Sequence, residues 1–248
     1  MTRLFFILTA PLCLAHTAEP IAPAISADEP LQLSPLAKEL AACGEDEAGI
    51  RARLELLATH LTQQAAIYQL HSLPVPDVRL IPISVEKGDG RHVGGAQWAA
   101  NNHIVRLRMC FFTSALPTAT NEASRIQREM HLNDTLMHEL VHCCFYFRYP
   151  KLAKISEGEP LVICEGVAIA AARHFIHQHY FGSHPIPQGF YESQILSPRY
   201  ARLYRTFCSR YLGPDHQIQW QKIDAAELQV APAGYELRNR TQISGFPL

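Results

Sequence analysis

Residues 135–145 read Thr135-Leu136-Met137-His138-Glu139-Leu140-Val141-His142-Cys143-Cys144-Phe145, and the rest of the chain is organised around this stretch. Successive residues of a helix turn by about 100°, so His138 and His142 lie one turn apart on the same face. Both imidazoles can then point a nitrogen at one metal ion. Glu139 lies to one side, where it can reach a water molecule beside that ion. The spacing predicts a metal-binding helix.

The residues around this motif support a helix. Apolar side chains recur at helical spacing, at Leu136, Leu140, Val141 and Phe145. Residues 133–135, Asn-Asp-Thr, are all suitable N-cap residues, so we expect the helix to begin there. Residues 121–130 are expected to form a separate short helix or an irregular front to the metal helix. Pro150 and the connection 151–159 should end it.

A third ligand must come from elsewhere, because catalytic zinc normally has three protein ligands and one open position. The best candidate is Glu165, on a helix predicted to begin with Pro160 at its first position. Its carboxylate projects from an apolar stripe made by Leu161, Ala168, Ile169, Ala172 and Ile176. An unpaired carboxylate is costly to bury, and a metal ion would relieve that cost. Gly166, beside it, lets two helices approach closely.

Three other residues are alternative third ligands: Glu157, Glu159 and His174. The two glutamates lie in a connection that contains Gly and Pro, which favours solvated loop or cap residues. His174 lies about two and a half turns beyond Glu165, which favours a packed or exposed side chain.

Together, His138-Glu139-x-x-His142 and, 23 residues later, Glu165-Gly166-x-Ala168 resemble the gluzincin group of zinc metallopeptidases. With an upstream hairpin the resemblance covers roughly residues 94–172, the core of the active site. The related pattern His-Glu-x-x-His-x-x-Gly-x-x-His is excluded, because Phe145 and Arg148 stand where its Gly and its third His would be.

The resemblance implies an α+β fold: a zincin-like core with a small antiparallel sheet and a metal-binding helix pair. It implies that His138, His142 and Glu165 hold Zn²⁺, that Glu139 is the general base, and that the substrate is a peptide or protein. A hairpin before the metal helix would pair with the extended substrate. A Tyr or His would stabilise the oxyanion, and four residues stay open for that role: Tyr191, Tyr200, Tyr204 and His184.

Two other kinds of protein remain alternatives. One is a binding module on a zincin scaffold that does not turn over substrate. The other is a protein with a structural zinc site, in which Cys143, Cys144 or Cys164 supplies a fourth ligand.

The N-terminus predicts export. Residues 1–18 carry an early Arg, an apolar run and then small residues, as in a secretory signal peptide. Residues 19–33 are rich in Pro and Ala and predict a flexible leader, and residues 34–248 form a single domain. We expect a secreted or periplasmic protein with no stable membrane span once the signal is removed.

The composition limits the kinds of partner that the protein is expected to bind. With 48% hydrophobic and 18% charged residues the chain is ordinary globular material, and its net charge of −1 gives no electrostatic case for nucleic acid. Oligomeric state is not indicated. Six cysteines follow the signal, and an even number in an exported chain favours disulfides. If zinc joins the two helices, a bridge from Cys164 to Cys143 or Cys144 is a further hypothesis.

The remaining elements serve as scaffold. A short helix is predicted from Ser34-Pro35 to Gly44, and a longer one over 46–71. Residues 78–85 read as a strand, with Pro82 at an edge or irregularity, and 94–110 as a β-hairpin. A last helix is expected between Ser197-Pro198 and Gly213-Pro214, with an aromatic stripe along one face.

Overall fold

The computed structural model describes residues 33–70, 73–86, 94–101, 104–112, 116–182, 195–214 and 216–230. The predicted signal peptide and all but the last residue of the leader lie outside these ranges. So do two of the oxyanion candidates, His184 and Tyr191, and the C-terminal residues 231–248.

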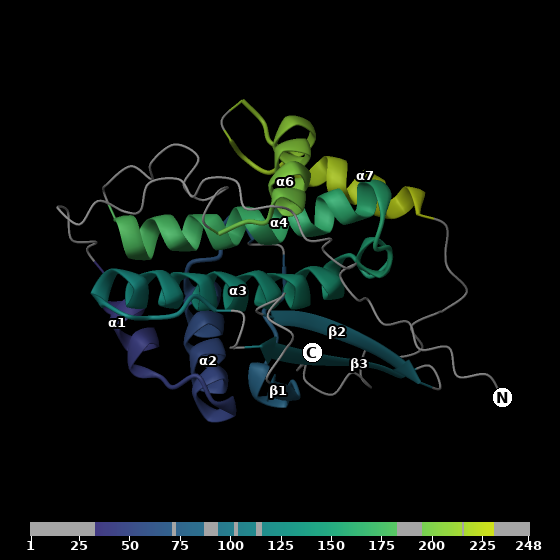
Figure 1. Ribbon diagram of the computed structural model, residues 1–248. Coiled ribbons are helices and arrows are strands. Elements are labelled where there is room, and N and C mark those ends of the chain that lie inside the picture. The colour runs from purple at the N-terminus through teal and green to yellow at the C-terminus, as the bar shows by residue number, and fades with distance from the viewer. Residues whose placement is uncertain are drawn as a thin grey trace.

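Two long helices form the centre of the molecule. Helix α3 (Glu122–Arg148) carries the His motif and α4 (Gly158–Ile176) carries Glu165, and the two lie side by side (Figure 1). The single turn η3 (Leu152–Lys154) connects them, and α4 continues into a π-helical turn, η4 (His177–Phe181). The two helices that carry the predicted metal ligands therefore form the central layer of the fold.

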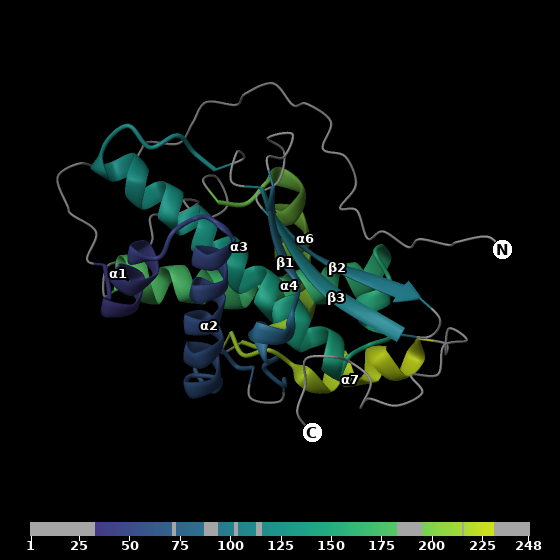
Figure 2. The ribbon, with the colours of Figure 1, turned by 90° about the horizontal axis from the view of Figure 1, so that it is seen from below.

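The other elements cover this pair from both sides. A small sheet and the helices α1 (Pro35–Ala42) and α2 (Glu47–Gln63) lie beside α3 (Figures 1 and 2). Helices α6 (Pro198–Tyr211) and α7 (Trp220–Gln229) lie on the opposite side, with α6 packed on α4. Gly166 makes that packing close, because a Cβ there would lie 2.1 Å from Cγ of Phe207 on α6.

Helix α3 corrects two sequence-based expectations. It is one continuous helix from residue 122, so residues 121–130 are neither a separate helix nor an irregular front. Its cap is Asn121, whose side chain accepts a hydrogen bond from the Ser124 amide at 2.9 Å, while Ser124 Oγ accepts one from the Asn121 amide. The expected cap at 133–135 is wrong because Asn133 is buried inside the helix, where its side chain bonds to other elements.

The sheet is mixed, so the expectation of a purely antiparallel sheet is wrong. Strands β2 (Gly94–Asn101) and β3 (Ile104–Phe112) form the predicted antiparallel hairpin. Strand β1 (Ile83–Glu86) pairs with β3 in parallel, and the order is β1-β3-β2. Residues 78–80 form the 3₁₀ turn η1 rather than strand, because Asp77 accepts a hydrogen bond from the Arg79 amide at 3.1 Å.

The sequence predicted the first residues of the helices α1 and α6 well and the last residue of α2 poorly. Ser34 and Ser197 cap α1 and α6, each followed by Pro, as expected. Helix α2 stops at Gln63 instead of near residue 71, and the chain then turns, with Tyr68 Oη 2.8 Å from Nε2 of His60. Helix α4 begins at Gly158 with a φ of +62°, which glycine accommodates, so Pro160 is the third helical residue and not the first.

The continuous stretch Gly158–Phe181 is 24 residues long with a mean hydropathy of 1.2, long and apolar enough to cross a membrane. In the protein it packs against α3 and α6, and 56% of its most apolar part is buried. This environment is that of a core helix.

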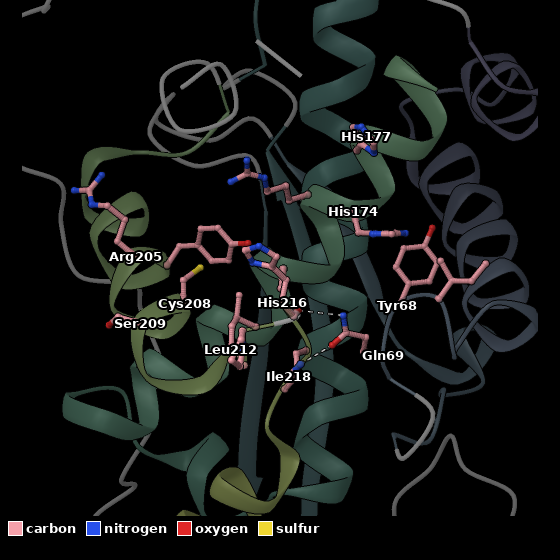
Figure 3. Close-up of a pocket in the computed structure, with 16 residues that line it drawn as sticks. Tyr68, Gln69, His174, His177, Arg205, Cys208, Ser209, Leu212, His216 and Ile218 are labelled. Atoms are coloured by element: carbon pink, nitrogen blue, oxygen red, sulfur yellow. Dashed lines mark hydrogen bonds between the residues drawn. The ribbon is translucent and has the colours of Figure 1, made fainter. Parts of the chain in front are cut away.

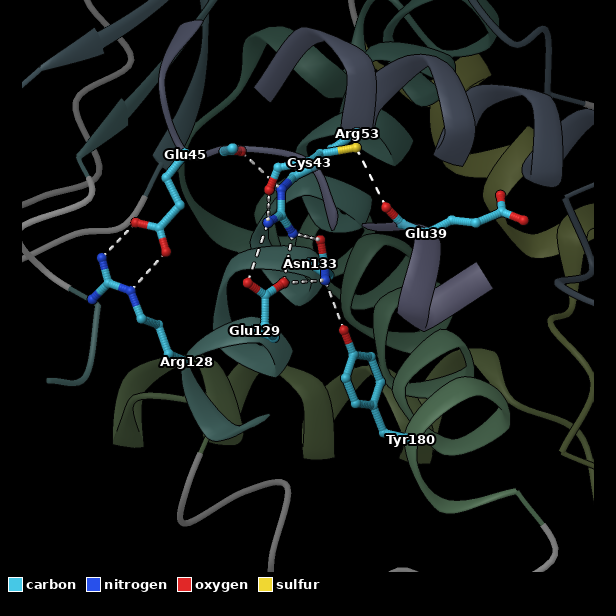
Figure 4. A network of polar contacts seen from close by, with 9 residues as sticks. Glu39, Cys43, Glu45, Arg53, Arg128, Glu129, Asn133 and Tyr180 are labelled. Carbon is cyan, nitrogen blue, oxygen red and sulfur yellow. Dashed lines mark hydrogen bonds and ion pairs between the residues drawn. The ribbon is translucent and has the colours of Figure 1, made fainter. Parts of the chain in front are cut away.

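A buried ionic network joins α2 to the start of α3 (Figure 4). Arg53 is fully buried, and its Nη1 donates to Glu129 at 2.6 Å and to Asn133 at 3.1 Å. Its other nitrogens donate to the carbonyls of Cys43 and Gly44. The Asn133 amide donates in turn to Tyr180 Oη at 2.7 Å. The network thus links α2, α3 and η4.

We expect Glu129→Ala to lower the free energy of unfolding by about 3–5 kcal/mol, because it leaves the Arg53 charge buried without its counter-ion. Urea unfolding measures this change. The matched control is Glu122→Ala, which removes an exposed pair with Arg125 on the same helix and should cost less than about 1 kcal/mol. Equal losses in the two variants would contradict the role given to Glu129.

Candidate metal centre

The structure brings the three predicted ligands together. Nε2 of His138 lies 2.9 Å from Nε2 of His142, and Oε2 of Glu165 lies 3.2 Å from the first and 3.4 Å from the second. A tetrahedral zinc ion with bonds of roughly 2.0–2.1 Å separates its ligands by roughly 3.3–3.4 Å. The three atoms therefore have a mutual spacing close to that of three zinc ligands.

The chemistry of the donor set also fits a cation. All three side chains are largely buried, with only 12–15% of each exposed. Oε2 of Glu165 is buried and has no well-aligned hydrogen bond from any described residue. Three electron-pair donors facing one another repel unless protons or a cation lie between them. Among the described residues this is the one group of three or more His, Cys, Asp or Glu side chains that could hold a metal ion.

The ionisation of the group follows from its burial and its charges. Burial alone would lower the pKa of His142, but the nearby Cys164 and Glu165 outweigh it and raise that pKa well above its usual value. Burial would likewise raise the pKa of Glu165, yet His142 and His138 lower it. The carboxylate of Glu165 is thus charged at neutral pH, as a metal ligand must be.

Cys164 contacts the far side of one imidazole. Its Sγ lies 3.3 Å from Nδ1 of His142, the nitrogen that does not face Glu165. A metal-bound His usually donates this second N–H to an outer partner that holds the ring in place. Cys164 occupies that position here.

We expect Cys164→Ala to weaken zinc binding by about 10–100-fold, because the ring of His142 loses the partner that orients it. Competition with a chelator of known affinity measures this constant. The control is Cys43→Ala, on the half-exposed loop after α1, whose affinity should match wild type. Unchanged affinity in the Cys164 variant would show that the thiol does not position His142.

The cysteines do not form the bridge considered above. All six that follow the predicted signal are free thiols, so the hypothesis of a bond from Cys164 to Cys143 or Cys144 is wrong for this structure. The two side chains point to other partners: Sγ of Cys164 faces His142, and Sγ of Cys143 donates to the main-chain oxygen of Glu139 at 3.1 Å. Neither sulfur joins the His–His–Glu group as a fourth ligand.

The alternative third ligands lie elsewhere. Glu159 accepts a hydrogen bond from Tyr211 Oη at 2.6 Å and pairs with Arg210, both on α6. Glu157 is the exposed N-cap residue of α4. His174 packs edge-on against Tyr68, with ring centroids 5.1 Å apart.

The predicted general base and the two described candidates for stabilising the oxyanion lie at different distances from the candidate metal site. Glu139 is 8% exposed and lies on α3 beside the two His ligands. The ring of Tyr200 lies 6.3 Å from that of His138, centroid to centroid, so α6 brings this tyrosine close to the candidate metal site. Tyr204 lies one turn further on, where the Arg173 guanidinium lies 5.8 Å from its ring centroid.

Strand β2 passes close to the metal helix. A Cβ added to Gly94 would lie 2.8 Å from Cγ2 of Thr135, one turn before His138. Because β3 is central, β2 is an edge strand of the described sheet. An edge beside the ligands is a position from which an extended peptide can add to a sheet.

The sequence analysis missed a second polar cluster. Nε2 of His60 lies 3.1 Å from Nε2 of buried His179. Nδ1 of His179 lies 2.8 Å from Oγ of Ser34, and Tyr68 Oη contacts both histidines. Ser34, His60 and His179 are far apart in sequence, so no local signal predicts the cluster.

This cluster predicts a pH-dependent stability. Burial, with help from the charges of His60 and His174, lowers the pKa of His179 to about 4. Unfolded His179 titrates near its ordinary value of about 6.5, so between these two pH values only the unfolded chain binds this proton. The stability is therefore complete above about pH 6.5 and should fall by up to about 3 kcal/mol as pH drops towards 4.

Urea unfolding of wild type and His179→Gln between pH 7 and 4 tests this expectation, because contributions from other groups cancel in the comparison. The variant should lose less stability than wild type over this range. Parallel curves would contradict the role of His179.

Comparison of the chain with protein-family models, with curated proteins and with solved structures finds no match. The resemblance to gluzincins therefore rests on the motif and on the geometry described above.

Proposed function

We propose that this chain is an exported, zinc-dependent peptidase of the gluzincin type. The observation that carries the proposal is the convergence of His138 Nε2, His142 Nε2 and Glu165 Oε2 within 2.9–3.4 Å of one another. Export is inferred from residues 1–18, which favour a secreted or periplasmic location.

His138, His142 and Glu165 would hold the metal. When bound, zinc supplies Lewis acidity that polarises a carbonyl and makes a water molecule more acidic. The three side chains come from two helices of the protein core, so they are positioned before any substrate arrives. No described cysteine completes the set, which supports an open position rather than a closed structural site.

Glu139 would act as the general base. It follows His138 directly, so its carboxylate projects beside the ligand face rather than into it. From there it takes a proton from the attacking water and returns it to the leaving amine. Tyr200, whose ring lies 6.3 Å from that of His138, is the described residue best placed to donate a hydrogen bond to the oxyanion.

The substrate would be a peptide or protein bound along β2. The edge of this strand that pairs with no other described strand offers main-chain donors and acceptors beside the helix that carries His138, at the contact between Gly94 and Thr135. Pairing with an edge strand holds an extended peptide by its backbone and tolerates many side chains.

The proposal is tested by elemental analysis of the purified protein together with cleavage of a broad peptide library, with and without a chelator. We expect about one zinc per chain and cleavage that the chelator abolishes and added zinc restores. Zinc without cleavage of any peptide would favour the binding-module alternative. Absence of zinc would reject the proposal.

A further inference from the structure

A second group of ligand-type atoms involves none of the residues of the candidate metal centre. His60 is on α2, Tyr68 lies in the turns after that helix, and His179 is on the π-helical turn η4. Nε2 of His60 lies 3.1 Å from Nε2 of His179. Tyr68 Oη lies 2.8 Å from the first nitrogen and 3.5 Å from the second. The three atoms therefore form a triangle that joins the α2 region to η4.

Hydrogen bonds alone satisfy this triangle poorly. An imidazole Nε2 carries either one proton or one lone pair, so it forms a well-directed hydrogen bond with only one neighbour. Nε2 of His60, however, lies within 3.1 Å of both other corners. A cation among the three atoms would interact with all of them at once. The distances permit this, because one point can lie roughly 2.0–2.1 Å, the length of a zinc–nitrogen bond, from all three corners.

The surroundings hold the two imidazoles in position. Ser34 Oγ lies 2.8 Å from Nδ1 of His179, and a metal-bound His usually donates this second N–H to such an outer partner. The ring of Phe175 contacts both imidazoles, with its centroid 4.7 Å from that of His179 and 6.3 Å from that of His60. The π-helical turn that carries His179 is a rare conformation, found often at functional sites. These donors are therefore positioned before any ion arrives.

Tyr68 connects the group to a cavity of about 1030 Å³. This tyrosine lines the cavity together with His174, whose ring centroid lies 5.1 Å from its own (Figure 3). Tyr68 is only 3% exposed and His179 only 5%. An ion can therefore approach from the cavity on the side of the phenol, and once bound it would be largely shielded from water.

The donor types limit the kind of ion. In the described chain no Cys, Asp or Glu joins His60 and His179 as a third ligand, so the set is two imidazole nitrogens and one phenolic oxygen. Imidazole suits zinc, copper and nickel, whereas calcium and magnesium take oxygen ligands. Among the divalent ions of the first transition row, copper binds most tightly to a given site.

We propose that His60, His179 and Tyr68 form a second metal site, which takes a divalent transition-metal ion and binds copper(II) most tightly. Tyr68 Oη gives its proton to solvent when it binds the ion. Oε1 of Gln178, 3.4 Å from Tyr68 Oη, is a further oxygen next to the site. Because the candidate zinc centre uses other residues, this inference does not depend on the proposed peptidase activity.

Copper titration of the full chain carrying His142→Ala tests the proposal, since this background removes a ligand of the other centre. Competition with a chelator of known affinity should show about one strong site per chain. Coordination of copper(II) by a phenolate gives an absorption band in the visible range, and we expect that band. Zinc should bind the same site more weakly than copper does.

Three variants on this background test the ligands. Tyr68→Phe removes one hydroxyl and should abolish the band and weaken copper binding by about tenfold. His60→Gln and His179→Gln should each weaken binding by more than about a hundredfold. The matched control is His177→Gln, on the same π-helical turn but outside the triangle, which should bind as the background does.

Circular dichroism verifies that the variants are folded, and Tyr68→Phe, which keeps the aromatic ring, decides the question if a His variant is not. Absence of a strong copper site on the His142→Ala background would overturn the proposal. So would a band retained in Tyr68→Phe, or equal losses in the His177 and His179 variants. Binding that persists in His60→Gln would assign the copper to other histidines and overturn it as well. The pH dependence of stability described above refers to the chain in the presence of a chelator.

Discussion

Glu165→Gln is expected to weaken zinc binding by more than about a hundredfold. The substitution keeps the size of the side chain but removes the charge of the one anionic ligand, whose Oε2 lies 3.2–3.4 Å from both imidazole nitrogens. Loss of an outer-shell partner typically costs 10–100-fold, and loss of a direct ligand should exceed this. Competition with a chelator measures the affinity, and elemental analysis after dialysis measures the retained metal.

A second measurement connects the same ligand to folding. Zinc at about a hundred times its dissociation constant should stabilise wild type by about 2.7 kcal/mol, and the variant should gain almost nothing at that concentration. The matched control is Glu157→Gln, the exposed cap residue of α4, which should keep wild-type affinity. Wild-type zinc binding by Glu165→Gln would remove Glu165 from the ligand set and with it the gluzincin proposal.

Glu139→Gln should retain zinc and lose hydrolysis by a factor of about 10²–10⁴. The amide is the same size as the carboxylate but cannot accept the proton of the attacking water. Zinc affinity within about twofold of wild type should accompany this loss, because Glu139 is not among the three converging ligands. Peptide cleavage rates and metal content on the same samples provide both numbers.

The pair of results separates two roles. If Glu139→Gln lost zinc and hydrolysis together, Glu139 would be a structural part of the metal site. If it kept full hydrolysis, another residue would be the base. His142→Ala, which removes one ligand, should lose both properties and is the positive control for metal loss.

The sequence by itself determined the local features. The four-residue spacing of His138 and His142 places both imidazoles on one face of any helix, and their nitrogens are 2.9 Å apart in the structure. Ser34 and Ser197 began helices as predicted, because capping depends on residues within one turn. Glu165 was selected by the cost of burying an isolated carboxylate, and that argument depends only on its apolar neighbours.

Tertiary contacts decided the rest. Asn133 is a good cap residue by type, but Arg53 and Tyr180, far away in the sequence, bond to its side chain inside a continuous helix. The parallel pairing of β1 with β3 depends on a contact between residues such as Ile83 and Met109, which alternation along one strand does not encode. A bridge from Cys164 to Cys143 or Cys144 was one hypothesis from the sequence, but in the structure Cys164 faces His142.

The packing of α6 on α4 has the same origin. Sequence periodicity places a side chain on one face of its own helix, whereas the neighbour that this face meets is set by the packing of the whole chain. The spacing of the two His residues on α3 was therefore predictable from the sequence, whereas the contact of Cys164 with His142 was decided by the tertiary structure.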